Sequence, residues 1–183
     1  MLPLTTERLH LRRLRADEAT FVHACRNLPA VARYQSWVPD TVDEVATFIA
    51  TLQDAPVLLP GRWFQLAIAR RSDDTCLGDI ALSLDAQDPT VAEFGIALHP
   101  DHQGAGLARE AMAALIAHVF AHSSVRRWRA SVDPRNTASI RLCTALGFHR
   151  HALIPRAFEI RGEWVDDAVY FLDRPQTDEQ NKD

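Results

Sequence analysis

The sequence predicts an α+β protein whose strands form one mixed β-sheet. Segments with strand character fill the middle of the chain, and helical segments are not evenly interleaved with them as they would be in an α/β fold. The 183 residues are 47% hydrophobic and 24% charged, which is typical of a globular protein. A chain of this length can bury enough apolar surface to fold without crosslinks. We therefore expect a single domain over residues 1–173.

The N-terminal third predicts one strand followed by two helices. Residues 8–14, RLHLRRL, alternate apolar and polar side chains, which is the pattern of a half-buried strand. Residues 17–28 have apolar side chains at helical spacing, and Asp17 is the expected N-cap. Residues 41–53 carry an apolar stripe at the same spacing and predict the second helix.

The middle of the chain predicts three strands. Residues 62–70 and 76–85 consist largely of apolar side chains, and the turn-forming sequence RSDDT joins them. Residues 91–99 form the third strand of this group, which ends at Pro100. Strands dominate this part of the chain, which agrees with an α+β fold and a mixed sheet.

The C-terminal half predicts helices and strands in alternation. A long amphipathic helix extends to about His122, followed by a strand over 126–133. A short helix begins near Asn136 and is closed by Gly147 as a left-handed C-cap. Two final strands, over 148–160 and 163–173, flank a two-residue Arg-Gly turn.

Composition excludes several classes of function. The formal net charge of −4 provides no general attraction to nucleic acid or to an anionic membrane. Three cysteines without CxxC spacing indicate neither a disulfide framework nor a thiolate metal cluster. No apolar stretch has the length of a signal peptide or a membrane span, so we expect a cytoplasmic protein. Residues 174–183 contain no apolar side chain and are expected to be a disordered tail.

A glycine-rich turn, HPDHQGAGLA, leads into the long amphipathic helix. Glycine weakens the start of a helix, so its presence there suggests that something approaches the backbone closely. The unpaired N–H groups at a helix N-terminus and the helix dipole together attract anions. Gly104, Ala105, Gly106 and Ala108 leave those N–H groups uncovered, and Gln103 can add an amide donor. The turn predicts a phosphate site, with packing of small residues at a helix start as the alternative.

Three phosphate-binding motifs can be compared with this turn. A P-loop requires Lys followed by Ser or Thr, where this chain has Leu107 and Ala108. A dinucleotide-binding fingerprint requires a third glycine where Arg109 stands, and it belongs to an early βαβ unit. The third motif binds the pyrophosphate of coenzyme A. Its order is Gln or Arg, two residues, Gly, one residue, then Gly or Ala, and residues 103–108 fit every position.

Segments on both sides of the turn match a known family. FGIALHP precedes it, NTASIRLCTALGF follows it, and TERLHLRRL, YQSWVP and CLGDIALS stand at the family's usual intervals. The closing hairpin contributes Gly162, Trp164, Asp166 and Tyr170. With these segments the sequence resembles the GNAT superfamily of acyl-CoA N-acyltransferases over nearly its whole length. It is most similar to the branch that contains the ribosomal-protein N-terminal acetyltransferases.

The resemblance implies a twisted mixed sheet of the GNAT type, flanked by helices, whose fourth and fifth strands splay apart. Acetyl-CoA would lie in the gap as co-substrate, and its pantetheine arm would pair with the backbone of the splayed strand, whose N–H and C=O groups need partners. The expected cofactor-binding residues are Ile96, Ala97, Leu98, Gln103, Gly104, Ala105, Gly106, Leu107, Ala108 and Asn136.

Acyl transfer to an amine needs a neutral amine, stabilisation of the tetrahedral oxyanion and a proton for the departing thiolate. Glu93 is the first candidate for the base, because strand alternation places it on one face with Gly95 and Ala97, beside the expected thioester. A surface ion pair is the alternative role for Glu93. Asp79 on the neighbouring strand is the second candidate. The oxyanion donor is expected among the backbone N–H groups near Ile96 or Ala97.

The short helix predicts candidates for the acid that protonates the thiolate. Many relatives carry a Tyr there, in the arrangement LYxxLGF, whereas this chain reads LCTALGF with Cys143 in that position. Cys143 could donate the proton or simply pack in the core. Ser139 is the other candidate, because its hydroxyl could reach the sulfur. Asn136 is expected to cap the helix, to bond the pantetheine, or to do both.

These residues predict an N-acetyltransferase that moves an acetyl group from acetyl-CoA directly to a primary amine. The amine could be the α-amine of a protein N-terminus or belong to a small molecule. A catalytically inactive acyl-CoA-binding sensor or scaffold is the alternative, because the usual Tyr is missing. We expect no metal, because the His pairs at 99/102 and 118/122 lack an HExxH pattern. We also expect no nucleic-acid or membrane partner, and a homodimer is left open.

Overall fold

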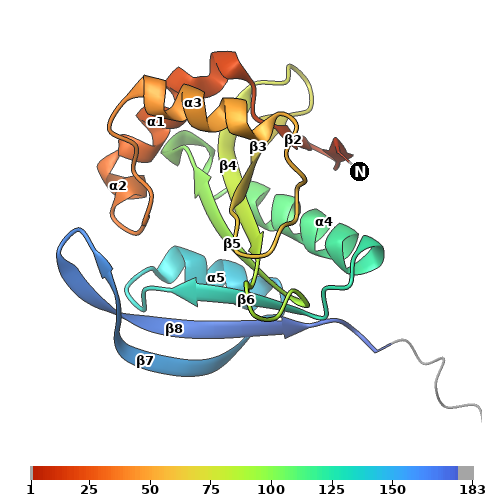
Figure 1. The fold of residues 1–183 in the computed structure, drawn as a ribbon, viewed down its shortest axis with the longest axis vertical. Coiled ribbons are helices and arrows are strands. Elements are labelled where there is room, and N and C mark those ends of the chain that lie inside the picture. Colours follow the sequence, from red (N-terminus) through yellow and green to blue (C-terminus); the bar gives the residue numbers. More distant parts are fainter. Residues whose placement is uncertain (1, 177–183) are drawn as a thin grey trace, which may run out of the picture.

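The computed structural model describes residues 2–176 and contains a single eight-stranded sheet (Figure 1). The strand order is β1-β2-β3-β4-β5-β6-β8-β7. Neighbouring strands are antiparallel except for β5 and β6, which run parallel, so the predicted α+β architecture with a mixed sheet is confirmed. The strands are β1 (Leu4–Thr5), β2 (Leu9–Arg13), β3 (Phe64–Arg70), β4 (Cys76–Leu84), β5 (Val91–Leu98), β6 (Arg127–Val132), β7 (His149–Ile160) and β8 (Glu163–Asp173).

Helices pack on both faces of the sheet. Successive side chains of β3 point to opposite faces, so Ala67 packs in a cluster with α1 and α3, whereas Leu66 and Ile68 pack in a larger cluster with α4. In the described part of the chain, no helix combines the length and apolar character needed to cross a membrane. The helices are α1 (Ala19–Asn27), α2 (Pro29–Ala32), α3 (Val42–Leu52), α4 (Leu107–His122) and α5 (Thr137–Ala145), with short 3₁₀ turns η1 (Ala16–Glu18) and η2 (Pro100–His102).

The elements predicted from the sequence are present within a few residues of their expected bounds, but the expected N-cap at Asp17 is wrong. Residues Ala16–Glu18 form the 3₁₀ turn, and α1 begins only at Ala19, without a side-chain cap. The cause is Glu18, whose carboxylate accepts hydrogen bonds from the Arg12 guanidinium at 2.6 and 3.0 Å and from Arg15 N–H at 2.8 Å. These bonds hold the tighter turn in front of the helix. The short elements β1 and α2 were not predicted.

Strands β5 and β6 separate after three paired positions. Val91, Ala92 and Glu93 pair with β6, and the ladder then stops, so residues 94–98 lie beside a gap. On the other side, β5 stays paired with β4 as far as Leu98. The splayed pair predicted from the family resemblance is thereby confirmed. In Figure 1 the gap lies between the ends of β5 and β6 that point toward α2 and α5.

The closing hairpin joins β7 and β8 through a tight turn at Arg161 and Gly162, as predicted. Both residues have left-handed backbone angles, φ +51° and +81°, which suits a two-residue hairpin. Of the tail expected over 174–183, residues 177–183 lie outside the described residues. Arg174 belongs to the fold, because it donates to the carbonyls of Arg126 at 2.8 Å and Ser123 at 2.6 Å.

Candidate active site

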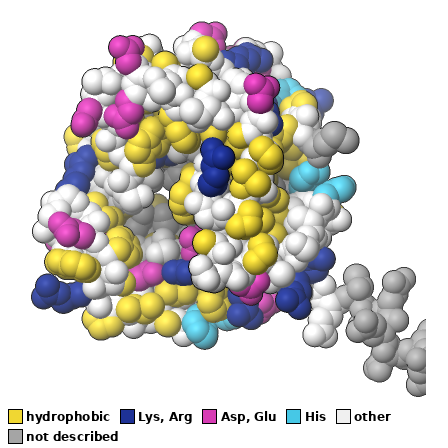
Figure 2. Space-filling view, in the orientation of Figure 1, with side chains coloured by type: hydrophobic (Ala, Val, Ile, Leu, Met, Phe, Trp, Pro, Cys, Tyr) yellow, Lys and Arg dark blue, Asp and Glu magenta, His cyan; other side chains and the backbone are white. Residues whose placement is uncertain are grey.

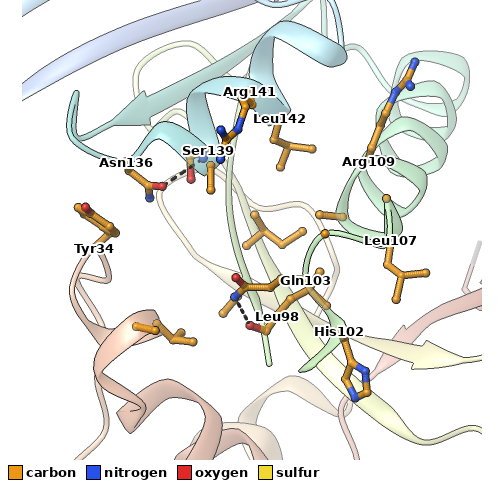
Figure 3. A pocket seen from close by; sticks show the side chains of 18 of the residues that line it. Tyr34, Leu98, His102, Gln103, Leu107, Arg109, Asn136, Ser139, Arg141 and Leu142 are labelled. Carbon is orange, nitrogen blue, oxygen red and sulfur yellow. Dashed lines mark hydrogen bonds between the residues drawn. The ribbon is translucent and has the colours of Figure 1, made fainter. Parts of the chain in front are cut away.

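A cavity of about 500 Å³ opens where β5 leaves β6, and we call it the first cavity (Figure 3). It is bounded by the end of β5, the glycine-rich turn, the first turn of α4, α5, and the segment after α2. Nearly all of the cofactor-binding residues expected from the sequence meet here. Those that line it are Ile96, Ala97, Leu98, Gln103, Gly104, Gly106, Leu107, Ala108 and Asn136.

The glycine-rich turn leaves the N-terminus of α4 accessible. Gly104 and Gly106 have left-handed backbone angles, φ +77° and +78°, which a side chain would strain. Gly106 is the N-cap of α4, and no side chain caps the first N–H groups of the helix. A Cβ atom at Gly104 would meet no atom within 4 Å. The turn therefore offers bare N–H donors at the positive end of a 16-residue helix, which is the geometry of an anion site.

Arg8 and Glu110 hold this turn from the side away from the first cavity. Arg8 donates to Glu110 through its Nε at 2.6 Å and to the Ala105 carbonyl through Nη1 at 3.0 Å. Thr6 and the Arg8 N–H also donate to the Glu110 carboxylate. Burial opposes ionisation of Glu110, but these hydrogen bonds outweigh it and lower the carboxyl pKa. Ala105 does not line the first cavity. It contributes to the turn through its carbonyl, which accepts the hydrogen bond from Arg8.

Strand parity decides which backbone groups of β5 face the gap. The His99 N–H donates to the Leu77 carbonyl at 3.0 Å, so the hydrogen-bonded pairs of the β4–β5 ladder fall on odd positions of β5. The backbone groups of Ile96 and Leu98 consequently point into the gap, whereas those of Ala97 point to β4. Ala97 lines the cavity with its side chain alone.

Two glutamine amides occupy the gap-facing carbonyls. Gln35 Nε2 donates to the Ile96 carbonyl at 3.3 Å, and Gln103 Nε2 donates to the Leu98 carbonyl at 2.9 Å (Figure 3 shows the second bond). The bond to Leu98 uses one hydrogen of the Gln103 NH₂ group and leaves the second for the phosphate contact expected from the sequence. Gln35 was not singled out from the sequence.

Gln35 is oriented by a buried ion pair. Arg26 on α1 and Asp79 on β4 pair through both guanidinium and carboxylate edges, with side chains 3% and 2% exposed. Arg26 also donates to Gln35 Oε1 at 3.4 Å and stacks on the Trp37 ring at 4.7 Å. A guanidinium has donors only, so the Gln35 oxygen must face Arg26 and its NH₂ must face the gap. Asp79, expected as the second candidate base, is committed to this pair instead.

A second cavity, of about 600 Å³, lies on the other side of the gap toward β6 and the β7–β8 hairpin. It contains Glu93, Arg129 and Cys143, and aromatic side chains including Trp63 and Phe158. The two cavities adjoin, because they share lining residues from the segment after α2, from β5 and from α5. The shared residues are Tyr34, Gln35, Ile96, Asn136, Ser139 and Leu142.

Glu93 forms the ion pair considered for it and also faces a cavity. Its carboxylate lines the second cavity and also lies 2.9 Å from Arg129 Nε, as an ion pair rather than an aligned hydrogen bond. The side chain is 25% exposed, so water can reach it. Burial raises the pKa of Glu93 above the usual glutamate range, and the charge of Arg129 only partly opposes this. A carboxylate that is partly buried, with a raised pKa, is suited to accept a proton.

The short helix α5 supplies the other candidates. Asn136 Oδ1 accepts from Ser139 N–H at 3.1 Å, so its capping role is confirmed, and its amide also lines both cavities. Ser139 is half-buried between the two cavities. Cys143 lines the second cavity but is only 1% exposed, and burial raises its pKa to about 11. A thiol of that pKa stays protonated at neutral pH.

Three further residues line the first cavity. Arg109 on α4 and Arg141 on α5 add positive charge to it (Figure 3). Tyr34 comes from the segment after α2, and its hydroxyl donates to the Arg135 carbonyl at 3.3 Å. The sequence offers Tyr34 as an aromatic side chain that could line an acceptor pocket, and Arg141 as one of eight arginines between Arg126 and Arg161 that could form an anion-binding edge. Arg109 was missed, and only its position in the first turn of the helix after the glycine-rich turn could have drawn attention to it.

Comparison with known proteins agrees with this geometry. The sequence profile of the acetyltransferase (GNAT) domain matches residues 8–149. The uncharacterized N-acetyltransferase p20 of Bacillus licheniformis is 30% identical over 173 residues, which cover 94% of this chain and 96% of p20.

Solved structures share the fold at low sequence identity. RimL, a ribosomal L7/L12 α-N-protein acetyltransferase in complex with coenzyme A, has a TM-score of 0.78 at 18% identity, over 94% of this chain and 97% of RimL. The spermidine N-acetyltransferase of Vibrio cholerae, in complex with CoA and spermine, has a TM-score of 0.75 at 20% identity, over 92% and 96%. The profile match covers most of the chain and includes the splayed strands and the glycine-rich turn. The chain belongs to the GNAT family of acetyltransferases.

Proposed function

We propose that this acetyltransferase moves an acetyl group from acetyl-CoA directly to a primary amine, with the donor in the first cavity and the acceptor in the second. The observation that carries the proposal is that the two cavities adjoin where β5 parts from β6 and share the residues between them. Direct transfer needs donor and acceptor to arrive from opposite sides of one point. Side chains from α5, β5 and the segment after α2 surround that point.

The residues of the first cavity fit coenzyme A. The bare N–H groups after Gly104 and Gly106 would bind its diphosphate, and Arg109 and Arg141 would add charge attraction for its phosphates. Backbone groups of Ile96 and Leu98, together with the Asn136 amide, would bind the amide-bearing arm. Bound there, the coenzyme supplies an acetyl thioester. Structures of RimL and of the spermidine enzyme that contain CoA support this assignment.

Glu93 is the proposed proton acceptor for the amine. An alkylamine with a pKa near 10.4 needs about 4 kcal/mol to lose its proton at neutral pH, whereas an α-amine near 7.7–8.0 needs about 1 kcal/mol or less. Glu93 faces the second cavity and remains accessible to water, so it can take the proton directly or through one water molecule. Gap-facing N–H groups of β5, of which Ile96 carries one, are placed to stabilise the oxyanion.

Ser139 is the better placed of the two candidates for returning a proton to the sulfur. It lines both cavities, whereas Cys143 lines only the second and is almost completely buried. The thiol pKa of about 11 also lies well above that of an ordinary thiol, about 8.5, so Cys143 would give up its proton uphill. We assign Cys143 to packing and Ser139 to contact with the sulfur.

The acceptor is a primary amine, and its class is tested by measuring thiol release from acetyl-CoA with a panel of amines and peptides. RimL acts on a protein α-amine and the Vibrio enzyme is named for spermidine, so the panel should contain both kinds. We expect thiol release above the background of hydrolysis with at least one amine. Acetyl-CoA binding without release on any amine would instead support the inactive sensor or scaffold.

A further inference from the structure

Asp167 on β8 is a buried carboxylate that the proposed transfer does not use. It is 4% exposed and lines the second cavity. Its Oδ1 accepts a hydrogen bond from Val132 N–H at 3.1 Å. Among the ion pairs formed within residues 2–176, none involves Asp167. A buried carboxylate normally has a cation or several donors as partners, because removing it from water is costly.

The charges around the second cavity do not compensate Asp167. Among residues 2–176, Arg129 is the one cationic side chain that lines it, and it pairs with Glu93. Asp133 is neutralised from outside by Arg135 at 2.7 Å. The cavity therefore keeps an excess of negative charge. Its lining carboxylates are Glu93, Asp133, Glu159 and Asp167.

We propose that Asp167 binds a second positive charge on the acceptor, so that the enzyme prefers amines with a cationic group besides the one that reacts. The inference rests on the proposed function and deepens it. The reacting amine cannot remain paired with Asp167, because it must lose its proton before it attacks. A separate ammonium group keeps its charge throughout and compensates the buried carboxylate in every step.

The walls of the second cavity suit a chain that joins two amines. Tyr34, Trp63 and Phe158 line it, and aromatic faces attract both methylene groups and cations. Glu93 and Asp167 lie near enough to interact, since the charge of Asp167 contributes to raising the pKa of Glu93. An acceptor with two amines can place one beside each carboxylate. The acceptor class we assign is a short aliphatic diamine or polyamine.

The test compares 1,4-diaminobutane with butylamine, which has the same chain and one reacting amine but lacks the second charge. Binding is measured by titration calorimetry on the full chain saturated with desulfo-CoA, and transfer is measured by thiol release from acetyl-CoA. We expect the diamine to bind the wild-type protein at least tenfold more tightly than butylamine. In Asp167→Asn the ratio should fall to near one, while acetyl-CoA binding stays unchanged.

Asp167→Asn keeps an oxygen that accepts from Val132 N–H, so it removes the charge and not the fold contact. Asp166→Asn is the matched control, because Asp166 also accepts one backbone hydrogen bond, from Arg156 N–H at 2.9 Å, but does not line the cavity. It should behave as wild type. Equal binding of the two amines by the wild-type protein, or an unchanged ratio in Asp167→Asn, would overturn the inference. Selective diamine binding without transfer would instead refute the proposed function and leave the assignment of Asp167 in place.

Discussion

Replacing Arg26 by methionine should be among the most destabilising single changes outside the apolar core. The substitution leaves the Asp79 carboxylate, 2% exposed, without the guanidinium that binds it. Removing one partner of a buried ion pair typically lowers the free energy of unfolding by about 3–5 kcal/mol. At about 2–4 °C per kcal/mol for a domain of this size, we expect Tm to fall by roughly 6–20 °C.

The double variant Arg26→Met/Asp79→Leu tests whether the lost stability comes from leaving the Asp79 charge unpaired. It removes both charges from a site that apolar side chains can fill, and such replacements are often nearly neutral. We therefore expect the double variant to recover most of the lost stability, measured by urea unfolding followed by circular dichroism. A single variant within about 1 kcal/mol of wild type, or a double variant as unstable as the sum of both single changes, would refute the reasoning.

Three further tests address the site. Gly106→Glu should abolish measurable acetyl-CoA binding by calorimetry, because it places a carboxylate among the bare N–H donors; Gly162→Glu, at another left-handed glycine, should lose stability but keep binding. Glu93→Gln should lower kcat/KM by about 10²-fold or more and remove the fall of kcat/KM on the acid side of the pH profile. In the wild type this fall should occur at a pH above the usual glutamate range, because the raised pKa of Glu93 means that its base form is lost as pH falls through that pKa. An unchanged pH profile would exclude Glu93 as the base. Cys143→Ala should keep most of the activity and Ser139→Ala should lose more, and the reverse order would assign the proton donor to Cys143.

Local patterns were enough to predict most of the fold. Alternation identified β2, helical spacing identified α3, and the Arg-Gly turn set the closing hairpin. These signals depend on residues that are neighbours in sequence, so one chain suffices to find them. The glycine-rich turn could be predicted for the same reason, because its small residues and the helix that follows are contiguous in the sequence.

Contacts between distant residues could not be predicted. Asp79 was interpreted as a candidate base because nothing in its own segment indicates Arg26, which is 53 residues away and buries the same carboxylate. Asp17 failed as an N-cap because Arg12, on the preceding strand, binds Glu18 and tightens the turn before α1. In each case an arginine side chain from another element binds the carboxylate and changes its role, and the spacing of residues in the sequence does not indicate such a contact.

The two glutamine amides at the gap indicate where the affinity for the coenzyme must arise. A pantetheine arm that bonds the Ile96 and Leu98 carbonyls either replaces the bonds from Gln35 and Gln103 or shares those oxygens with them, because a carbonyl oxygen has two lone pairs. In either case each such carbonyl contributes only about 0.5–1.5 kcal/mol of net free energy. The larger contribution must then come from the bare N–H groups of α4, which no side chain caps. On the proposed function, we therefore expect the strand gap to fix the direction of the donor and the glycine-rich turn to determine how tightly a phosphorylated donor binds.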